Sequence, residues 1–446
     1  MTGRLGNGKN LLIVSFSYAP MLNPRAFRWT ALAEEFARRG VRVRVVCSWQ
    51  PGEASLQIIN GVEIHRVGIR FIERIRALLA HLRGRLPREG VGSSLQKPAM
   101  PLGNMVGWIW RQVAWPDTTC VWYASALRKA EALLRETHSA TIVSVSPAFT
   151  AALVGNAITR QQSGLRWVLD MGDPFSIADE SPANNFWLYS GLNRRVEHEL
   201  FRNADAVTLT NANVRRQYAE LYPGCADKLH VIPPLLTGTP PQPEMQPAVH
   251  LILDDPIRIV YVGSLYRQLR RPEFLLALFM GLVKIGGIRR LELHFFGDTN
   301  ECNDAFVPYA NQIGRTIHLH GVVPRANALA AVREATIVAN LGNTNPCQLP
   351  SKLVEYAAVG KPILNIVRNS GDASEDFMKS YRAILNLHDS AIPPSSAQIR
   401  LAEQFINESI QAVGNHCDDR WIEQFNVDAI ADQYAAVLFD VVPGRG

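Results

Sequence analysis

The sequence LPSKLVEYAAVGKPILNIV, residues 349–367, indicates a short helix followed by a buried strand. The proline in its second position suits a helix start, and Gly360 suits the left-handed conformation just past a helix end. Ile363–Val367 then predicts a strand. Lys352 and Glu355 are three residues apart, so they share one face of the helix near its start. A cation and a carboxylate at such a helix start are typical of a place where a phosphorylated ligand is held.

The length and composition of the chain predict a two-domain globular protein. A chain of 446 residues is too long for one hydrophobic core. Hydrophobic residues make up 47% and charged residues 19%, which excludes disordered and low-complexity classes. The six cysteines form no CxxC pair and no metal-ligand spacing, so we expect reduced thiols, a cytoplasmic location and no structural zinc site. No run of about 18 uncharged apolar residues is present, so a transmembrane helix is not expected.

Positive charge gathers in the N-terminal part of the chain. Residues 1–120 hold 17 Lys and Arg against 7 Asp and Glu, which predicts an anionic partner. Residues 70–88 form a basic amphipathic run, and three tryptophans follow within residues 108–115. One interpretation is that region 70–110 lies on the anionic inner face of a membrane, as a lipid-linked acceptor would require. The other is a helix packed on its domain with solvated arginines. No nucleic-acid partner is expected, because no recognised binding motif accompanies the charge.

Alternating strands and helices predict an α/β fold with doubly wound parallel sheets. The opening segment predicts a strand at Asn10–Ser17, a helix at Thr30–Arg39 and a strand at Val41–Cys47, with a loop before the helix. The Asn60-Gly61 pair predicts a hairpin. No GxGxxG fingerprint follows the first strand, which argues against a dinucleotide-binding start. In such sheets, ligands bind at the carboxyl ends of the strands.

The Pro-rich stretch 236–256 has no periodicity and predicts a linker between two domains. We therefore expect an N-terminal domain at residues 1–240, with the basic 70–110 region as an insertion, and a C-terminal domain at residues 257–420. Further strands are predicted at residues 141–145, 166–170, 205–209, 229–232, 258–262, 291–296, 317–320, 337–341 and 363–366. The last helix is predicted at residues 427–441.

Several motifs resemble those of GT-B glycosyltransferases of the group-4 type. They are YAP at residues 18–20, RRGVRVRVV at 38–46, VGSLYRQLRR at 262–271, HFFGD at 294–298 and LPSKLVEYAAVGKPIL at 349–364. The resemblance implies two Rossmann-like domains facing across a cleft. It implies a nucleotide-sugar donor held mainly by the C-terminal domain, an acceptor held by the N-terminal domain, no cofactor and no metal. It also implies that residues 421–446 contain a helix that crosses back to the first domain.

The loop after the first strand of the second domain is a candidate part of the donor site. The strand ends at Gly263, and the loop carries Arg267, Arg270 and Arg271. A diphosphate leaving group gains negative charge as the glycosidic bond breaks, so cations here would stabilise the transition state. The resemblance implies that an arginine, at Arg267 or Arg270, and a lysine, at Lys352, bind this diphosphate. Solvated arginines on a loop are the alternative.

Other donor-side candidates rest on the resemblance. Glu355 matches the second glutamate of the family's E-x7-E motif, which in relatives accepts hydrogen bonds from the donor ribose. The chain departs from the motif at its first glutamate, which is Cys347 here, and the departure concerns the donor sugar and the retaining mechanism. Asp298 follows a strand and is explained equally well by a turn or a site role. Further donor contacts are expected at Gly263, Ser351, Leu353 and Asn345.

The acceptor-side candidates lie in the N-terminal domain. Asn23, Arg25 and Arg28 are predicted in the first loop, where Arg25 would contact donor phosphate or an anionic acceptor. Asp173 follows the strand at 166–170, and the resemblance makes it a candidate for acceptor binding, as it does Asp117. Turn formation explains both aspartates equally well.

The working hypothesis is a metal-independent, retaining glycosyltransferase. It would move a sugar from a nucleotide-diphosphate sugar to a glycan, a lipid-linked acceptor or a small molecule. One alternative is a catalytically inactive scaffold or binding protein of the same shape, which the replacement at Cys347 would suit. The other is a sugar-nucleotide epimerase of the same architecture.

Overall fold

The chain divides into two compact units. The computed structural model describes residues 8–68, 102–137, 141–162, 164–178, 182–236, 256–288, 290–345, 347–350, 352–368, 371–390, 392–411 and 419–439. The first unit comprises residues 1–233 and 427–446, and the second comprises residues 234–426. The basic run 70–88, Ser351 and most of the predicted linker lie outside the described residues.

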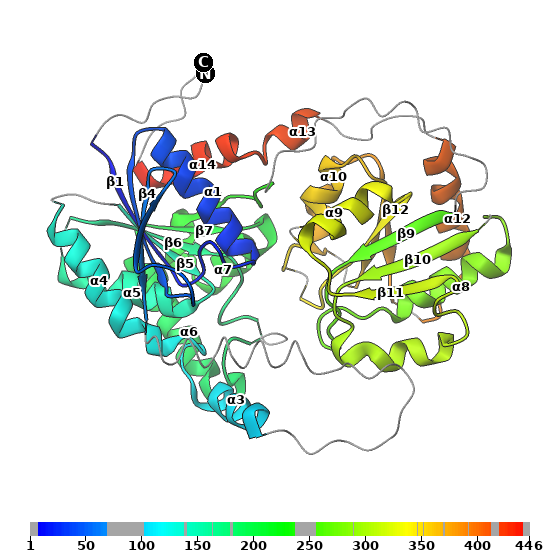
Figure 1. Ribbon diagram of the computed structural model, residues 1–446, viewed down its shortest axis with the longest axis horizontal. Coiled ribbons are helices and arrows are strands. Elements are labelled where there is room, and N and C mark those ends of the chain that lie inside the picture. The colour runs from blue at the N-terminus through cyan, green and yellow to red at the C-terminus, as the bar shows by residue number, and fades with distance from the viewer. Residues whose placement is uncertain are drawn as a thin grey trace. The chain divides into compact units, whose positions relative to one another are not determined.

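The first unit is built on a mostly parallel sheet (Figure 1). Its described strands follow the spatial order β3 (Leu56–Ile59), β4 (Val62–Val67), β2 (Arg42–Ser48), β1 (Asn10–Ser15), β5 (Thr141–Ser146), β6 (Arg166–Met171), β7 (Ala206–Leu209) and β8 (Leu229–Val231). Only the pairing of β3 with β4 is antiparallel among them. Asn60 and Gly61 have φ of 49° and 81°, so the predicted hairpin is confirmed and its turn has both central residues at positive φ.

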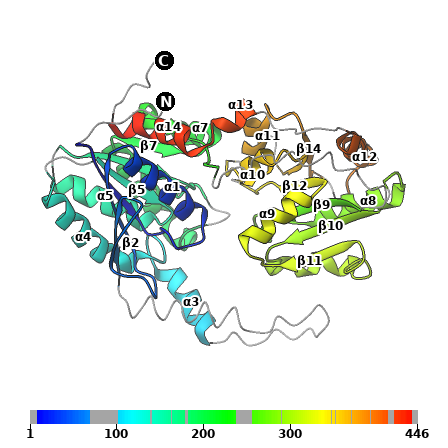
Figure 2. The ribbon, with the colours of Figure 1, turned by 45° about the horizontal axis from the view of Figure 1, so that its top comes forward.

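The first unit also contains α-helices. They are α1 (Pro24–Arg38), α3 (Leu102–Val113), α4 (Tyr123–Arg135), α5 (Phe149–Gln161), α6 (Phe186–Asn203), α7 (Ala212–Leu221) and α14 (Val427–Phe439). Helix α14 comes from the far end of the chain and lies beside α1 in Figures 1 and 2. Trp29 of α1 packs against Tyr434 of α14 with ring centroids 5.0 Å apart.

Helix α1 begins six residues earlier than the sequence predicted. Asn23 is its N-cap, because its side chain accepts a hydrogen bond from the Ala26 backbone N–H at 3.0 Å, and Pro24 occupies the first helical position. Arg25 and Arg28 therefore lie on the first turns of a helix. Their placement in a loop was wrong because the Asn-Pro pair is itself a helix-start signal.

The second unit contains a fully parallel sheet. Its described strands follow the order β11 (Ile317–Gly321), β10 (Leu291–Phe296), β9 (Ile257–Val262), β12 (Ile337–Leu341), β13 (Ile363–Val367) and β14 (Ile384–His388). Strand β14 was not predicted. It is a partly exposed edge strand in which buried and exposed residues do not alternate clearly. The order reverses between β9 and β12, which is the place where doubly wound sheets bind ligands.

Two hydrophobic layers pack against the second sheet. One contains residues from α8 (Glu273–Ile285), η3 (Asn300–Tyr309) and α12 (Ser396–Gln411). The other contains residues from α9 (Arg325–Glu334), α10 (Lys352–Ala358), α11 (Ala373–Met378) and α13 (Asp419–Glu423). Gly360 has φ of 70°, so the predicted left-handed end of α10 is confirmed. The two sheets together confirm the predicted class of two Rossmann-like α/β domains.

Candidate functional site

The candidate site of the second unit lies at the carboxyl ends of β9, β10 and β12. Gly263 follows β9 and donates its backbone N–H to the Phe296 carbonyl at 2.8 Å. A Cβ atom on Gly297, whose φ is 139°, would lie 2.2 Å from the Gly263 carbonyl oxygen. The two strand ends therefore approach so closely that only glycine fits at position 297. This close backbone packing fixes the position of the loop that carries the predicted arginines.

Lys352 reaches this edge from the first turn of α10. Its Nζ donates to the Val262 carbonyl at 2.9 Å, at the end of β9. Burial, helped by the nearby charge of Arg270, lowers the pKa of Lys352 to about 8 against the opposing effect of Glu355. Removing an ammonium group from water without an anionic partner is unfavourable. Within the described residues Lys352 has no ion-pair partner, so a bound anion would relieve this cost.

Arg270 is the loop arginine that joins Lys352. Its Nε donates to the Asn343 side-chain oxygen at 2.6 Å, and it also hydrogen-bonds to the Tyr261 hydroxyl. These neutral partners orient the guanidinium beside the end of β9. Arg267 instead forms an ion pair with Asp304 at 2.5 Å and donates to the Glu301 carbonyl at 2.6 Å. The structure therefore distinguishes Arg270, which has neutral partners, from Arg267, which is already paired with a carboxylate. Sequence spacing alone could not distinguish these two arginines.

The segment after β12 forms a compact polar turn beneath Arg270. Asn343 is fully buried, accepts from Arg270 and donates its Nδ2 to the Gln348 carbonyl at 3.0 Å. Asn345 accepts from the Cys347 backbone N–H at 2.9 Å. Both Asn345 and Cys347 are buried. These side chains shape the turn, and Asn343 links it to the Arg270 guanidinium.

Glu355 lies on the same helix as Lys352 and forms an ion pair with Arg325. Its Oε1 lies 2.6 Å from an Arg325 guanidinium nitrogen, and both side chains are partly exposed. Arg325 begins α9, directly after the loop that follows β11. Sequence analysis missed Arg325, although its place after a strand end and a proline was a usable signal. A ligand hydroxyl that approaches Glu355 would meet this pair.

The other donor-side candidates have local structural roles. The Asp298 side chain accepts from the Asn300 backbone N–H at 3.0 Å, as in an Asx turn at the start of η3. Leu353 is fully buried in the hydrophobic layer under α10, so its side chain packs inside the unit. Ser351 lies outside the described residues.

In the first unit, Asp170 near the end of β6 is the centre of a buried hydrogen-bond network. Its buried carboxylate accepts from Arg25 at 3.1 Å and from the Trp29 indole N–H at 2.8 Å. It also accepts from the Thr208 and Tyr434 hydroxyls, each at 2.7 Å. Burial alone would raise the pKa of Asp170, but the charges of two arginines and these hydrogen bonds hold it below its usual value.

Arg28 extends the same network to the end of the chain. It donates to the Tyr434 hydroxyl at 3.0 Å and to the carbonyls of Ile232 and Pro233 at 3.2 and 2.7 Å. Asp170 and Tyr434 were both missed by sequence analysis, since they are 264 residues apart and carry no local motif. Of the acceptor-side candidates, Asn23 caps α1 and Arg25 pairs with Asp170.

Asp173 begins a half-buried loop after β6 that is fixed by Glu197. The Glu197 carboxylate is fully buried and accepts hydrogen bonds from Ser176, Tyr218 and Tyr222. Burial raises the pKa of Glu197, against the lowering effect of these donors. The loop that carries Asp173 is therefore anchored to α6 and α7.

Asp117 has a capping role in the same unit. Its carboxylate accepts from the Thr150 backbone N–H at 2.9 Å, at the first turn of α5. It also accepts from the backbone N–H of Thr119 at 2.8 Å. These bonds hold the segment before α4 against the start of α5.

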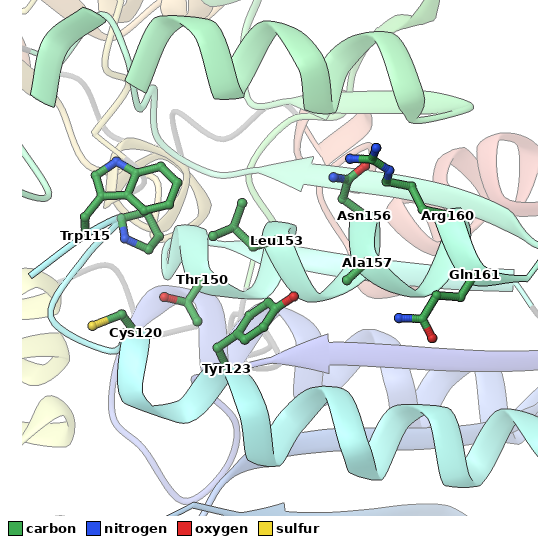
Figure 3. A pocket seen from close by; sticks show the side chains of 10 residues that line it. Trp115, Cys120, Tyr123, Thr150, Leu153, Asn156, Ala157, Arg160 and Gln161 are labelled. Atoms are coloured by element: carbon green, nitrogen blue, oxygen red, sulfur yellow. The ribbon is translucent and has the colours of Figure 1, made fainter. Parts of the chain in front are cut away.

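A cavity of about 600 Å³ lies along α5 in the first unit. Figure 3 shows Trp115 and Cys120 near one end of it and Arg160 and Gln161 near the other. Tyr123, Leu153 and Ala157 make much of its wall apolar. None of the predicted site residues lines it, so it is separate from the polar edge described above.

Comparison with solved structures defines the class of the fold. The chain matches the structure of HepE from Anabaena in complex with UDP-glucose, with a TM-score of 0.55, 14% identity and coverage of 97% of this chain and 100% of that chain. It matches α,α-trehalose 6-phosphate synthase from Burkholderia multivorans with a TM-score of 0.59, 11% identity and coverage of 97% and 99%. It matches WaaG, a glycosyltransferase involved in lipopolysaccharide biosynthesis, with a TM-score of 0.55, 12% identity and coverage of 97% and 100%. A search of curated protein sequences gives no match. The fold is therefore that of the GT-B glycosyltransferases.

The sequence of the first unit matches a known domain family. Residues 26–234 match the family described as glycosyl transferase 4-like domain. The chain therefore carries a glycosyl transferase 4-like domain in its N-terminal half. The predicted recognition and the predicted enzyme class, a glycosyltransferase, are confirmed.

Proposed function

We propose that this glycosyltransferase uses a nucleotide-diphosphate sugar and holds its diphosphate with Arg270 and Lys352. The observation that carries the proposal is the pair of cations at the end of β9. Lys352 is bound by a backbone carbonyl and Arg270 by an amide and a phenol, so their partners in the described part of the chain are neutral. A diphosphate would supply the missing negative charge at the ligand-binding edge of a doubly wound sheet.

The chemistry proposed for this site is sugar transfer with retention at the anomeric carbon. As the bond from the sugar to the diphosphate breaks, charge grows on the phosphate oxygen, and the two cations stabilise it more than they stabilise the intact donor. The acceptor hydroxyl attacks from the same face and gives its proton to the departing phosphate. No side chain of the chain has to act as a nucleophile, and no metal is required for charge neutralisation.

Glu355 is proposed to bind the donor ribose. Its carboxylate can accept hydrogen bonds from two neighbouring hydroxyls once its ion pair with Arg325 rearranges. Since that pair is partly exposed, its rearrangement costs about 0–1 kcal/mol. The turn at Asn345 and Cys347, which replaces the first glutamate of the family motif, is proposed to lie beside the donor sugar.

The donor is tested by thermal shift and turnover on the full chain. UDP-, GDP-, ADP- and CDP-sugars and the free diphosphates are screened, with UDP-glucose first because HepE was solved with it. We expect one nucleotide class to raise the Tm and its sugar to be released slowly without an acceptor. Lys352→Ala and Arg270→Ala should each strongly reduce both, while Arg267→Ala should leave both nearly unchanged. Retained binding and turnover in the first two variants would overturn the proposal.

The same experiment separates the alternatives. Tight donor binding with no turnover, with any acceptor, would indicate an inactive scaffold. Conversion of one sugar nucleotide into another without an acceptor would indicate an epimerase. A glycan, a lipid-linked sugar and a small-molecule acceptor are then compared for the rate at which they accelerate release of the diphosphate.

We further propose that the first unit approaches an anionic membrane surface, as a lipid-linked acceptor would require. None of the helices within the described ranges combines the length and apolar character needed to span a bilayer. However, Trp108 and Ile109 of α3 and Trp187 and Leu188 of α6 are exposed, Trp187 by 89%. The Tyr189 hydroxyl donates to the Val113 carbonyl at 3.0 Å and joins the two helices. Exposed aromatic and apolar side chains suit an interfacial position.

Vesicle flotation tests this membrane proposal. The full chain should float with vesicles of anionic phospholipid at low salt and remain unbound with neutral vesicles. Trp108→Ser with Trp187→Ser should weaken binding, and Trp115→Phe, a change at a side chain that hydrogen-bonds to Asn193, serves as control. Equal binding to neutral vesicles, or no binding to anionic ones, would contradict it.

A further inference from the structure

Three histidines and a glutamate gather on one face of β10 and β11 in the second unit. Glu292, His294 and Phe296 alternate along β10, and His318 lies opposite His294 in the parallel register. The opposite face of β10 supplies Leu291, Leu293 and Phe295 to the hydrophobic core. Figure 2 shows β11 at the edge of the sheet, next to β10. The cluster is therefore on the sheet face that does not join that core, at an edge where the side chains are partly exposed.

The polar atoms of this cluster are close together. One ligand atom from each of Glu292, His294 and His318 lies within 4.8 Å of the others. His294 Nε2 lies 3.2 Å from a Glu292 carboxylate oxygen, and its Nδ1 lies 3.0 Å from His320 Nε2. The rings of His294 and His318 are stacked with centroids 4.6 Å apart. Small side-chain rotations would bring such atoms to the roughly 2.0–2.2 Å that a zinc ion requires from each ligand.

Two independent features point to a missing partner. His318 Nε2 is buried and receives no hydrogen bond from the described residues. Such an atom is rare in a folded protein and calls for an explanation, one of which is an ion. The register of β10 and β11 also shifts, so that His320 is an extra residue between Leu319 and Gly321. A β-bulge re-aims the side chain it carries, and here it accompanies the approach of His320 to His294.

We propose that Glu292, His294 and His318 bind one divalent transition-metal ion, with His320 beside the fourth position. Two imidazoles and a carboxylate form a ligand set that zinc uses widely, and three protein ligands leave one position for water or another imidazole. The expectation of no zinc site rested on cysteine spacing, and this ligand set contains no cysteine. Glu292 and His294 are two residues apart, but His318 comes 24 residues after His294, so no short sequence motif contains all three.

The role of the ion would be structural. It would join the edge strand β11 to β10 through side chains, in addition to the backbone hydrogen bonds of the sheet. His320 stacks on Phe296 with ring centroids 4.1 Å apart, and Phe296 directly precedes Gly297. A bound ion would therefore also steady the strand end at the candidate donor site. This proposal does not depend on the proposed donor chemistry.

Zinc binding to the full chain tests the proposal. The protein is stripped with EDTA, dialysed against zinc chloride, and examined by isothermal titration, thermal shift and cobalt absorption spectroscopy. We expect one ion per chain, a rise in Tm with zinc, and visible cobalt bands typical of nitrogen and oxygen ligands. His294→Gln and His318→Gln should each weaken binding by at least about tenfold.

Matched controls make the outcome decisive. His388→Gln removes a partly exposed histidine that also faces a glutamate, Glu375, outside the cluster, and should bind zinc as the unchanged chain does. The Tm of every variant is first measured in EDTA. If a histidine variant is unfolded, zinc binding is measured instead in Glu292→Gln, which preserves the shape of the side chain and should also weaken binding. Absence of zinc binding, or equal loss in His388→Gln, would overturn the proposal.

Discussion

The two units both place basic side chains near the carboxyl ends of parallel strands, but these side chains have different partners. In the first unit, Arg25 pairs with the buried Asp170, and Arg28 binds a hydroxyl and two carbonyls. In the second, Lys352 and Arg270 bind neutral groups alone among the described residues. The same residue types are thus structural in one sheet and available to an anion in the other. Whether a basic side chain is available to bind an anion therefore depends on its hydrogen-bond and ion-pair partners more than on its position at a strand end.

The largest expected effect tests whether the basic side chains of the first unit have a structural role. Asp170→Asn should lower the free energy of unfolding by about 3–5 kcal/mol, because it leaves the partly buried Arg25 without its carboxylate. Urea denaturation measures the change. Glu199→Gln, which removes an exposed pair with Arg160, should cost about 0–1 kcal/mol. Equal costs for the two changes would show that the Asp170 network is not an important source of stability.

The second prediction tests whether Lys352 and Arg270 of the second unit bind the diphosphate. Arg270→Ala and Lys352→Ala should each lower kcat by about 10²–10³, because each removes a charge that stabilises the leaving diphosphate. Steady-state release of nucleoside diphosphate from the donor identified by thermal shift gives the rate. Arg267→Ala is the matched control, since that side chain already pairs with Asp304, and we expect less than about a threefold change. A larger loss in Arg267→Ala than in Arg270→Ala would reverse the assignment.

The third prediction concerns pH. Burial holds the pKa of Lys352 at about 8, so in the free protein its ammonium group is present below this pH and lost above it. Donor affinity should therefore fall as the pH rises through about 8, as measured by nucleotide titration. Lys352→Arg keeps its charge and should remove this dependence. A profile in the arginine variant that matches the unchanged chain would assign the dependence to another group.

Folding stability should change in the opposite direction. Between about pH 8 and the ordinary lysine pKa of 10.5, the unfolded chain binds a proton at Lys352 that the folded chain does not. Stability therefore rises with pH across this window, by proton linkage. Lys352→Met should remove this contribution and raise the Tm at pH 7, because it removes a buried charge. The expected combination is a more stable protein that binds the donor poorly.

The smallest expected effect concerns donor affinity, and it distinguishes the roles of Glu355 on α10 and Arg325 on α9. Glu355→Gln should weaken donor binding by about 10–100-fold, the usual loss for a hydrogen bond to a charged group. Arg325→Ala should change affinity by less than about fivefold, because partly exposed pairs contribute little. Isothermal titration with the nucleoside diphosphate distinguishes them. Similar losses in both variants would mean that Arg325 itself binds the donor.

Much of the fold could be predicted because each element carries its own signal. Lys352–Ala358, Gly360 and the following strand were recognised from a helix start, a left-handed helix end and a buried apolar run. Where local signals were weak or misread, the prediction failed. Strand β14 is a half-exposed edge strand, and the start of α1 was missed because Asn23-Pro24 was interpreted as a loop.

The candidate site was less predictable, for a physical reason. The loop motif offered three arginines, and only the distances from Arg267 to Asp304 and from Arg270 to Asn343 separate them. Those partners lie 37 and 73 residues away in sequence. Sequence identifies which groups lie near a strand end, but hydrogen bonds to distant residues determine which of them are already satisfied.

The return of α14 to the first unit has a consequence for biosynthesis. Tyr434 completes the hydrogen bonds of Asp170 and Arg28, yet the ribosome makes it only after the whole second unit. At about 5–20 residues per second, residues 234–426 take roughly 10–40 s to synthesise. During that interval the nascent first unit has its sheet but lacks its last helix, and the apolar surface that Trp29 and Phe36 later share with α14 is exposed. A stop codon anywhere before residue 427 would make that incomplete state permanent. The exposed apolar surface of α1 is therefore the surface that we expect a nascent-chain chaperone to bind.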